Sequence, residues 1–218
     1  MPNHHPDDDI LFAYAAGSQE EPLSLLVATH LALCPGCRSD VERLEEVGGI
    51  VFDTQESQAL SSGSVDRILA RLDDVEAQVP VNKDYKSSLP TDNQIPLPLR
   101  DYLGGEMKGL NWKSYRNLEE AVLLSDIPDI RTRMMRIRAG AAMPTHTHSG
   151  TELTLVLSGG FSDDAGHYLR GDVSTADASV VHRPIADMGE DCICLAVSEG
   201  SLRLTGPVGR WLNPFVRI

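Results

Sequence analysis

Residues 78–99 divide the chain into two parts with different periodicities, and this division constrains the fold more than any other feature. The segment reads QVPVNKDYKSSLPTDNQIPLPL, with four prolines among polar residues. A stretch of this composition, with no lasting apolar period, is typical of an extended linker. Helical spacing of apolar residues precedes it and short alternating runs follow it. The sequence therefore predicts one domain at 1–77, a linker at 78–99 and a second domain at 100–218.

The part before the linker, 1–77, contains four segments with helical spacing. Asp7 can cap the first, Pro22 is tolerated in the first turn of the second, and Gly48-Gly49 is expected to end the third. In the fourth, apolar residues recur every three or four positions from Val65 to Val75. This part should form a small bundle of about four helices, with the segments ILFAYAA, LSLLVATHLALC, RSDVERLEEV and SVDRILARLDDV.

Short runs of alternating apolar and polar residues dominate the chain after the linker. Four of them end near a glycine suited to a turn: RMMRIRAG, ELTLVLSG, DCICLAVSEG and SLRLTG. Regularly spaced runs of this kind predict an antiparallel barrel or sandwich. The expected fold class is therefore a two-domain α + β protein, with a helical bundle followed by a β domain.

Most of the negative charge lies before the linker. The segment 1–77 holds 15 Asp and Glu against 4 Lys and Arg, a net charge of −11 out of −13 for the whole chain. An acidic surface repels phosphate, so we do not expect direct binding to nucleic acid. It would suit a basic protein partner, and a purely solvated acidic surface is the alternative.

The composition also bears on the compartment. No apolar run approaches the roughly 18 residues that suggest a membrane span. The start, MPNHHPDDD, lacks the basic head and apolar middle of a secretory signal. We therefore expect a cytoplasmic protein without membrane association. Its four cysteines should then serve metal or redox chemistry rather than a disulfide framework.

A first candidate metal site lies in the stretch HLALCPGC. His30 and Cys34 are four residues apart, so they share one face near the end of a helix. Pro35-Gly36 turns the chain and places Cys37 at the start of the next helix. Three zinc ligands should therefore gather at one helix–turn–helix corner. A buried histidine beside two free thiols is the alternative, and a redox CxxC is less favoured because no strand precedes it.

The fourth ligand of this site must come from elsewhere in the segment 1–77, because a closed structural zinc has four ligands. His4, His5 and the aspartates at 7–9 are the candidates, and histidine suits a site with two thiolates better than a carboxylate does. With four protein ligands, such a zinc would be structural and would leave no position for a substrate.

A second candidate metal site lies in the strand-rich part. His146 and His148 are two residues apart, so a strand directs both to one side. Glu152 follows after a turn, and His182 arrives from a distant strand. Three imidazoles and one carboxylate suit Zn²⁺, which we prefer, with Fe, Mn, Ni or Cu as alternatives. A metal-free barrel with unused histidines is the other interpretation.

The remaining cysteines, Cys192 and Cys194, are two residues apart in the run DCICLAV. They should face the same side of one strand. Small core residues are the preferred interpretation, and a redox-responsive pair is the alternative.

Two motifs resemble those of known families. The segment AYAAG…VATHLALCPGC resembles the zinc-containing anti-sigma domain of the ChrR family. Alignment on AYAAG implies that His5, rather than His4, is the fourth ligand. The stretch from Gly140 to Gly159, with both histidines and Glu152, resembles the first cupin motif. The second cupin motif retains His182 but departs at three positions, with Asp177, Ser179 and Ala186 where cupins carry proline, glycine and asparagine.

The resemblance to ChrR-type anti-sigma factors covers nearly the whole chain, including DCICLA and the ending PFVRI. It implies a β-barrel of the cupin, or double-stranded β-helix, type. It also implies a regulator without enzymatic activity that inhibits one extracytoplasmic-function sigma factor and releases it on an oxidative signal, singlet oxygen or organic peroxide, sensed through the cupin-like domain. The rival hypothesis is a metal-dependent cupin enzyme, such as a dioxygenase, with an accessory helical module.

Overall fold

The computed structural model describes residues 1–78, 95–104, 107–124 and 127–205. Most of the predicted linker and the PFVRI ending lie outside these residues. Below, the helical half means residues 1–78 and the strand half means residues 95–205.

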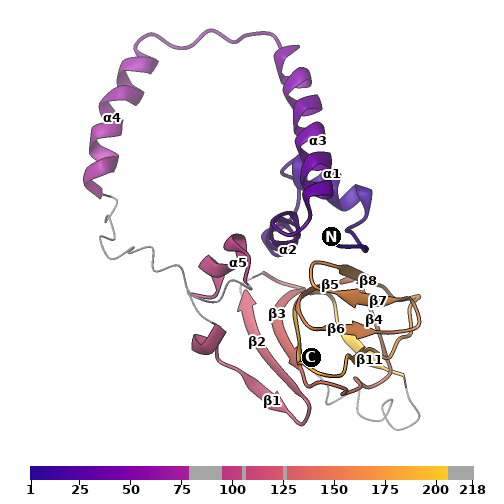
Figure 1. Cartoon of the computed structure of the whole chain (residues 1–218). Helices are drawn as coiled ribbons and strands as arrows, with labels where there is room; N and C mark the ends of the chain where they lie inside the picture. The colour runs from indigo at the N-terminus through magenta and orange to yellow at the C-terminus, as the bar shows by residue number, and fades with distance from the viewer. Residues whose placement is uncertain (79–94, 105–106, 125–126, 206–218) are drawn as a thin grey trace.

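The helical half contains the four predicted helices. They are α1 (Asp8–Ala15), α2 (Glu21–Leu31), α3 (Pro35–Asp53) and α4 (Ser64–Gln78). The strand half begins with a short helix, α5 (Leu97–Tyr102), and a 3₁₀ turn, η1 (Met107–Gly109). Figure 1 shows α1, α2 and α3 grouped near the sheets, while α4 stands apart from them.

The third helix is longer than its sequence pattern predicts. It begins at Pro35 and continues through Gly48-Gly49 to Asp53, so the prediction that the glycine pair ends it is wrong. Each glycine costs a helix about 1 kcal/mol relative to alanine but still supplies a backbone N–H. Proline at the first helical position lacks only an N–H that would have no partner within the helix. The extension beyond the glycine pair carries three exposed apolar residues, Ile50, Val51 and Phe52, and Val47 just before the pair is exposed as well.

The described strands form three antiparallel sheets. The largest has six strands in the order β1-β2-β3-β10-β5-β8, and the others have the orders β7-β6-β9 and β11-β4. All four predicted runs contain strands, namely β3, β5, β10 and β11. The bounds are β1 (Lys113–Tyr115), β2 (Leu118–Leu124), β3 (Ile130–Ile137), β4 (His146–His148), β5 (Glu152–Ser158), β6 (Gly160–Ser162), β7 (His167–Leu169), β8 (Val173–Ala176), β9 (Ile185–Ala186), β10 (Cys192–Glu199) and β11 (Leu202–Leu204).

The predicted closed barrel is not found among the described residues, which form a cupin-like sandwich instead. Isolated bridges, Ala142 to Ile185 and His146 to His182, link the segment that leads into β4 with the segment that leads into β9. The short strands β4 and β9 supply too few residues for a continuous ladder between the sheets. The space between the sheets holds the second group of histidines described below.

The helical half packs directly against the strand half. Leu25 and Leu26 of α2 are buried in the same apolar cluster as Leu155 of β5 and Leu195 of β10. At the edge of this contact, the Tyr102 hydroxyl donates to Glu21 at 2.8 Å. The two halves therefore share a core as well as the chain that joins them. No helix within the described ranges combines the length and apolarity needed to cross a membrane.

Candidate metal centres

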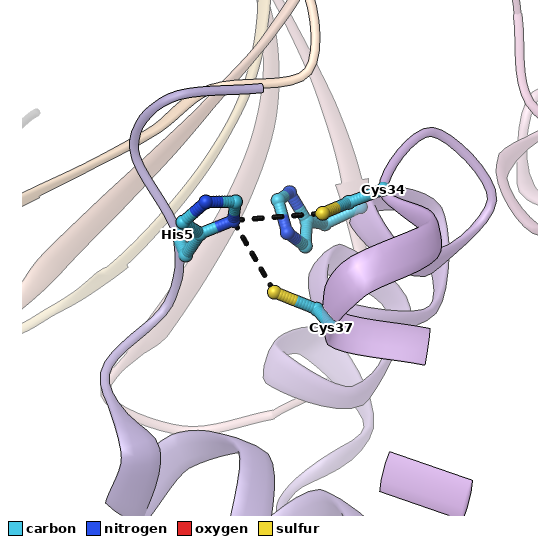
Figure 2. A group of neighbouring side chains, drawn as sticks. His5, Cys34 and Cys37 are labelled. Atoms are coloured by element: carbon cyan, nitrogen blue, oxygen red, sulfur yellow. Dashed lines mark hydrogen bonds between the residues drawn. The ribbon is translucent and has the colours of Figure 1, made fainter. Parts of the chain in front are cut away.

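The structure brings together the four residues predicted for the N-terminal site. One ligand atom each from His5, His30, Cys34 and Cys37 lies within 4.8 Å of the other three. His5 comes from the segment before α1, His30 from the end of α2, and the cysteines from the start of α3. Nδ1 of His5 lies 3.5 Å from Sγ of Cys34 and 3.3 Å from Sγ of Cys37. Figure 2 marks both contacts with dashed lines.

One imidazole nitrogen of His30, Nε2, lies in this group and makes no hydrogen bond to the described residues. Its Nδ1 donates to the Gly171 carbonyl at 2.8 Å, which leaves the proton off Nε2. Nε2 is buried and has no hydrogen-bond partner among the described residues. Burial also lowers the pKa of His30, so the ring is neutral at pH 7. A buried nitrogen lone pair facing two sulfurs is what a metal ion would satisfy.

The thiol of Cys37 needs a nearby cation to ionise. Both cysteines are almost fully buried, and burial, followed by the neighbouring Cys34, raises the pKa of Cys37 to about 12. Without a cation, Cys37 would keep its thiol proton. A divalent metal would displace the thiol protons, and two thiolates with two imidazoles are a donor set typical of structural zinc. The residues therefore fit the predicted ion.

His4, the other N-terminal candidate, lies outside this group. Its ring packs on Tyr168 of β7 with 4.5 Å between the ring centroids. His4 and His5 thus have different surroundings, since the His5 ring lies against the two sulfurs and the His4 ring lies against Tyr168.

The three histidines predicted for the second site also meet. His146 and His148 lie on β4, and His182 lies in the loop before β9. Nε2 of His182 is 3.1 Å from Nε2 of His146 and 3.4 Å from Nε2 of His148. All three residues are buried, and His146 and His182, with several apolar side chains, line a cavity between the sheets of about 70 Å³.

Hydrogen bonds on the far side of two rings determine which nitrogens face the centre. Nδ1 of His146 donates to the Pro144 carbonyl at 2.8 Å, and Nδ1 of His182 donates to Oδ2 of Asp163 at 2.9 Å. Their Nε2 atoms therefore carry no proton, and the lone pairs of the two atoms face each other. A metal ion bound between them would remove this repulsion. Burial lowers the pKa of His146 and of His148 to about 4, so both rings are neutral and able to ligate at pH 7.

Glu152, the predicted carboxylate ligand, is shared between this group and a buried arginine. Its Oε1 lies 3.6 Å from Nε2 of His148, while its Oε2 accepts a hydrogen bond from Arg133 at 3.1 Å. Arg133 of β3 also lies 3.6 Å from Glu120. The carboxylate is next to the histidines but outside the group of three whose nitrogens converge.

Sequence reasoning missed Asp163 and Arg133. Asp163 lies in the turn after β6 and holds His182, and Arg133 reaches Glu152 from a strand separated from it by β10. Neither residue has a motif or a spacing that marks it, because each meets its partner only after segments distant in the sequence have come together in the fold.

The cysteine pair lies beside the same cavity. Sγ of Cys192 and Sγ of Cys194 are 3.4 Å apart on one side of β10, and Cys194 lines the cavity. The hydrogen bond to Cys192 and then burial raise the pKa of Cys194 well above its ordinary value. A protonated buried thiol is a poor nucleophile, which favours the predicted role as core residues.

Known proteins match both the strand half alone and the chain as a whole. Residues 107–203 match the family described as the ChrR cupin-like domain. The chain is 37% identical over 216 residues to the anti-sigma-E factor ChrR of Cereibacter sphaeroides, an alignment that covers 99% of this chain and 98% of that protein.

Solved structures give the same result. The crystal structure of Rhodobacter sphaeroides SigE in complex with the anti-sigma ChrR superposes with a TM-score of 0.79 at 37% identity, over 91% of this chain and all of that one. An RmlC-like cupin protein of Ralstonia eutropha superposes with a TM-score of 0.43 at 18% identity, over 48% of this chain and 72% of that one, and no functional conclusion follows from it.

Proposed function

The chain belongs to the family of ChrR anti-sigma factors, and on that premise we propose that it binds an extracytoplasmic-function sigma factor one-to-one and holds it inactive. The family relationship over the whole chain also favours a regulator over an enzyme. The net charge of −11 in the segment 1–77 suits a basic partner and disfavours direct binding to DNA. We propose a cytoplasmic location, where such a partner would act, and no membrane association.

The observation that carries this proposal is a pair of exposed apolar helix faces. Large apolar side chains are exposed to solvent on the last two turns of α3 and along one face of α4, from Val65 to Leu72. Apolar groups of this extent usually mark a protein interface. In Figure 1 no other described element covers α4. The exposed fractions range from 55% to 77% for Val47, Ile50, Val51, Phe52, Val65, Ile68, Leu69 and Leu72.

These faces provide the test of partner binding. Ile68→Glu and Phe52→Glu should each weaken binding to the sigma factor by roughly 30-fold, because a central apolar contact is typically worth ~2 kcal/mol. Isothermal titration calorimetry with the purified sigma factor measures this. The stability of the free protein should change little, since both side chains are exposed.

The matched control for these variants is Met188→Glu, which places the same charge on a side chain of the strand half that is 85% exposed. It should leave binding unchanged. If all three variants bind the sigma factor as tightly as the unchanged protein does, the partner binds elsewhere on the molecule.

We also propose that the predicted division into 1–77, 78–99 and 100–218 separates two roles. Residues 1–77 would inhibit the sigma factor, and residues 100–218, joined to them by the linker, would control its release. Both apolar faces lie within residues 1–77, so a chain ending there should still repress sigma-dependent transcription and should no longer respond to an inducing signal. A reporter gene read with and without an oxidant measures both properties. Because truncation uncovers Leu25 and Leu26, the fragment's abundance must be measured alongside. A soluble, folded fragment that fails to repress would contradict the division.

For the two metal centres we propose distinct roles. His5, His30, Cys34 and Cys37 would hold a structural Zn²⁺ that ties α2 and α3 to the N-terminal segment. His146, His148 and His182, with Glu152 beside them, would hold a second divalent metal, Zn²⁺ by preference and Fe, Mn or Ni as alternatives. When bound there, such an ion would supply an electrophilic centre that can accept an oxygen ligand.

We propose that the second centre senses an oxidative signal of the singlet oxygen or organic peroxide type. Oxidisable sulfurs support this role, because the thioethers of Met135 and Met143 line the cavity together with His146 and His182. Thioethers and thiols are the side-chain groups most readily changed by oxidants. Cys192 and Cys194 together are the second candidate for the oxidised group.

A further inference from the structure

One turn of the strand half lies against the N-terminal metal centre. This turn, residues 169–173, joins β7 to β8. Its Asp172 is 1% exposed, and its carboxylate accepts backbone N–H groups from both halves of the protein. Asn3 and His4 donate to Oδ1 at 2.5 and 3.0 Å, and Leu169 donates to Oδ2 at 2.8 Å. A single buried carboxylate thus joins the turn to the segment that carries His5.

The residue before it, Gly171, holds the other histidine ligand. Its carbonyl accepts the Nδ1 proton of His30 at 2.8 Å, which is the bond that leaves Nε2 free for the metal. Gly171 has a φ of +94°, and a Cβ there would lie 2.8 Å from Cγ of Pro2. The close approach of the N-terminal segment to this carbonyl therefore requires glycine.

Further contacts fix the segment along the edge strand β8. The Val173 N–H donates to the His4 carbonyl at 3.1 Å, and the His4 ring packs on Tyr168. His5 follows directly in the chain, so its imidazole is held in place through His4. Both histidine ligands of the helical half are thus oriented by the strand half, one through Gly171 and one through Asp172.

Electrostatics agree with this geometry. Burial alone would raise the pKa of the Asp172 carboxyl, but the N–H donors of Leu169, His4 and Asn3 together hold its pKa below the ordinary value. The carboxylate is therefore charged, and hydrogen bonds to a charged buried group are stronger than those between neutral groups.

We propose that Gly171 and Asp172 are positioning residues of the N-terminal metal centre, so that the strand half supplies part of the outer shell of a site whose four ligands all lie in the helical half. This inference rests on metal binding at that centre but not on sigma-factor binding. Groups that orient metal ligands typically contribute roughly 10–100-fold to metal affinity or activity.

The turn also connects to the second metal centre. The Gly171 N–H donates to the Val156 carbonyl, and the Val156 N–H donates to the Asp172 carbonyl, so the turn is bonded to β5. Glu152, the first residue of β5, lies beside His148. A shift of β5 would therefore displace the carbonyl and the carboxylate that hold the N-terminal ligands.

The test uses the full-length protein with cobalt(II) as the probe metal. Thiolate-to-cobalt charge transfer gives an absorption band, and its loss in Cys34→Ser would assign it to the N-terminal centre. A chelator should remove this cobalt at least about 10-fold faster from Asp172→Asn than from the unchanged protein. Asp191→Asn is the control, because Asp191 also accepts a distant backbone N–H, that of Ala139, in a bond that lies wholly within the strand half.

A second variant acts from the other side of the contact. Asn3→Pro removes one N–H donor to Asp172 and changes nothing in the strand half. It should also speed extraction, and combining it with Asp172→Asn should add little, because both changes break the same contact. Should Asp172→Asn fail to fold by circular dichroism, Asn3→Pro alone decides. Extraction at the unchanged rate from a folded variant overturns the proposal, whereas absence of the band from the unchanged protein overturns the metal centre itself.

Discussion

Replacing Cys34 with serine should remove the metal from the helical half, loosen the packing of its helices and abolish binding to the sigma factor together. Structural zinc contributes ~10–16 kcal/mol of apparent binding energy that is linked to folding in small modules. The apolar cluster around this centre is small: within the described residues, Leu11, Val27, Leu31 and Val41 are buried beside the two cysteines. Such a cluster cannot replace the metal. Plasma mass spectrometry measures the zinc content, and calorimetry measures binding to the sigma factor.

Two further variants test this prediction: His5→Ala removes another candidate ligand, and His4→Ala is its matched control. His5→Ala should lose zinc as Cys34→Ser does, because its Nδ1 faces both sulfurs. His4→Ala should keep the metal, because the His4 ring does not face the sulfurs and the backbone bonds of residue 4 to Asp172 and Val173 do not depend on that ring. Full partner affinity in a zinc-free Cys34→Ser protein would contradict a structural role for the metal, and a reversed ranking of the two histidines would move the ligand by one residue.

Replacing His146 with alanine should abolish induction while repression persists. The histidine lies in the strand half, whereas the apolar faces proposed to bind the sigma factor lie on α3 and α4. Loss of one of three converging imidazoles should empty the second centre and leave the cupin-like sandwich without its proposed sensing group. Transcription from a sigma-dependent reporter, before and after a singlet oxygen or organic peroxide challenge, measures both states.

His167→Ala is the control for this experiment, because His167 is an exposed histidine of the same half that pairs with Asp187. It should repress and induce normally. Normal induction in His146→Ala would refute the sensing role of the centre, and loss of induction in Cys192→Ser instead would assign sensing to the cysteine pair.

The rival enzyme hypothesis predicts a different result. A dioxygenase-like protein would consume oxygen with a small substrate, and His146→Ala would lose that turnover. An oxygen electrode with the purified protein distinguishes a sensor, which should show no catalytic consumption, from an enzyme.

Local patterns were sufficient for much of the molecule. Apolar spacing predicted the four helices of the helical half, and alternation predicted β3, β5, β10 and β11. Most of the candidate ligands were also local: His30, Cys34 and Cys37 share one short stretch, HLALCPGC, and His146 and His148 share another, HTH. Helix and strand periodicities direct such neighbours to one side wherever the rest of the chain goes.

The choice of His5 over His4 required more than spacing. The residues alone left both open, and resemblance to the ChrR family favoured His5. The structure brings His5 to the sulfurs because Asp172 and β8 hold the preceding backbone in one register. That register depends on a turn at the far end of the sequence, since His4 and Asp172 are separated by 168 positions.

The sequence by itself thus determined the presence of the four helices, several of the strands and the local spacings of the candidate ligands, because each depends on residues a few positions apart. Only the tertiary structure decided that the helical half shares a core with the strand half, that Arg133 contacts Glu152, and that Gly171 and Asp172 accept hydrogen bonds from His30 and from the backbone before His5. The physical reason is that a buried polar group takes its partner from whatever the fold brings within about 3 Å, and no local period records which distant residue that is.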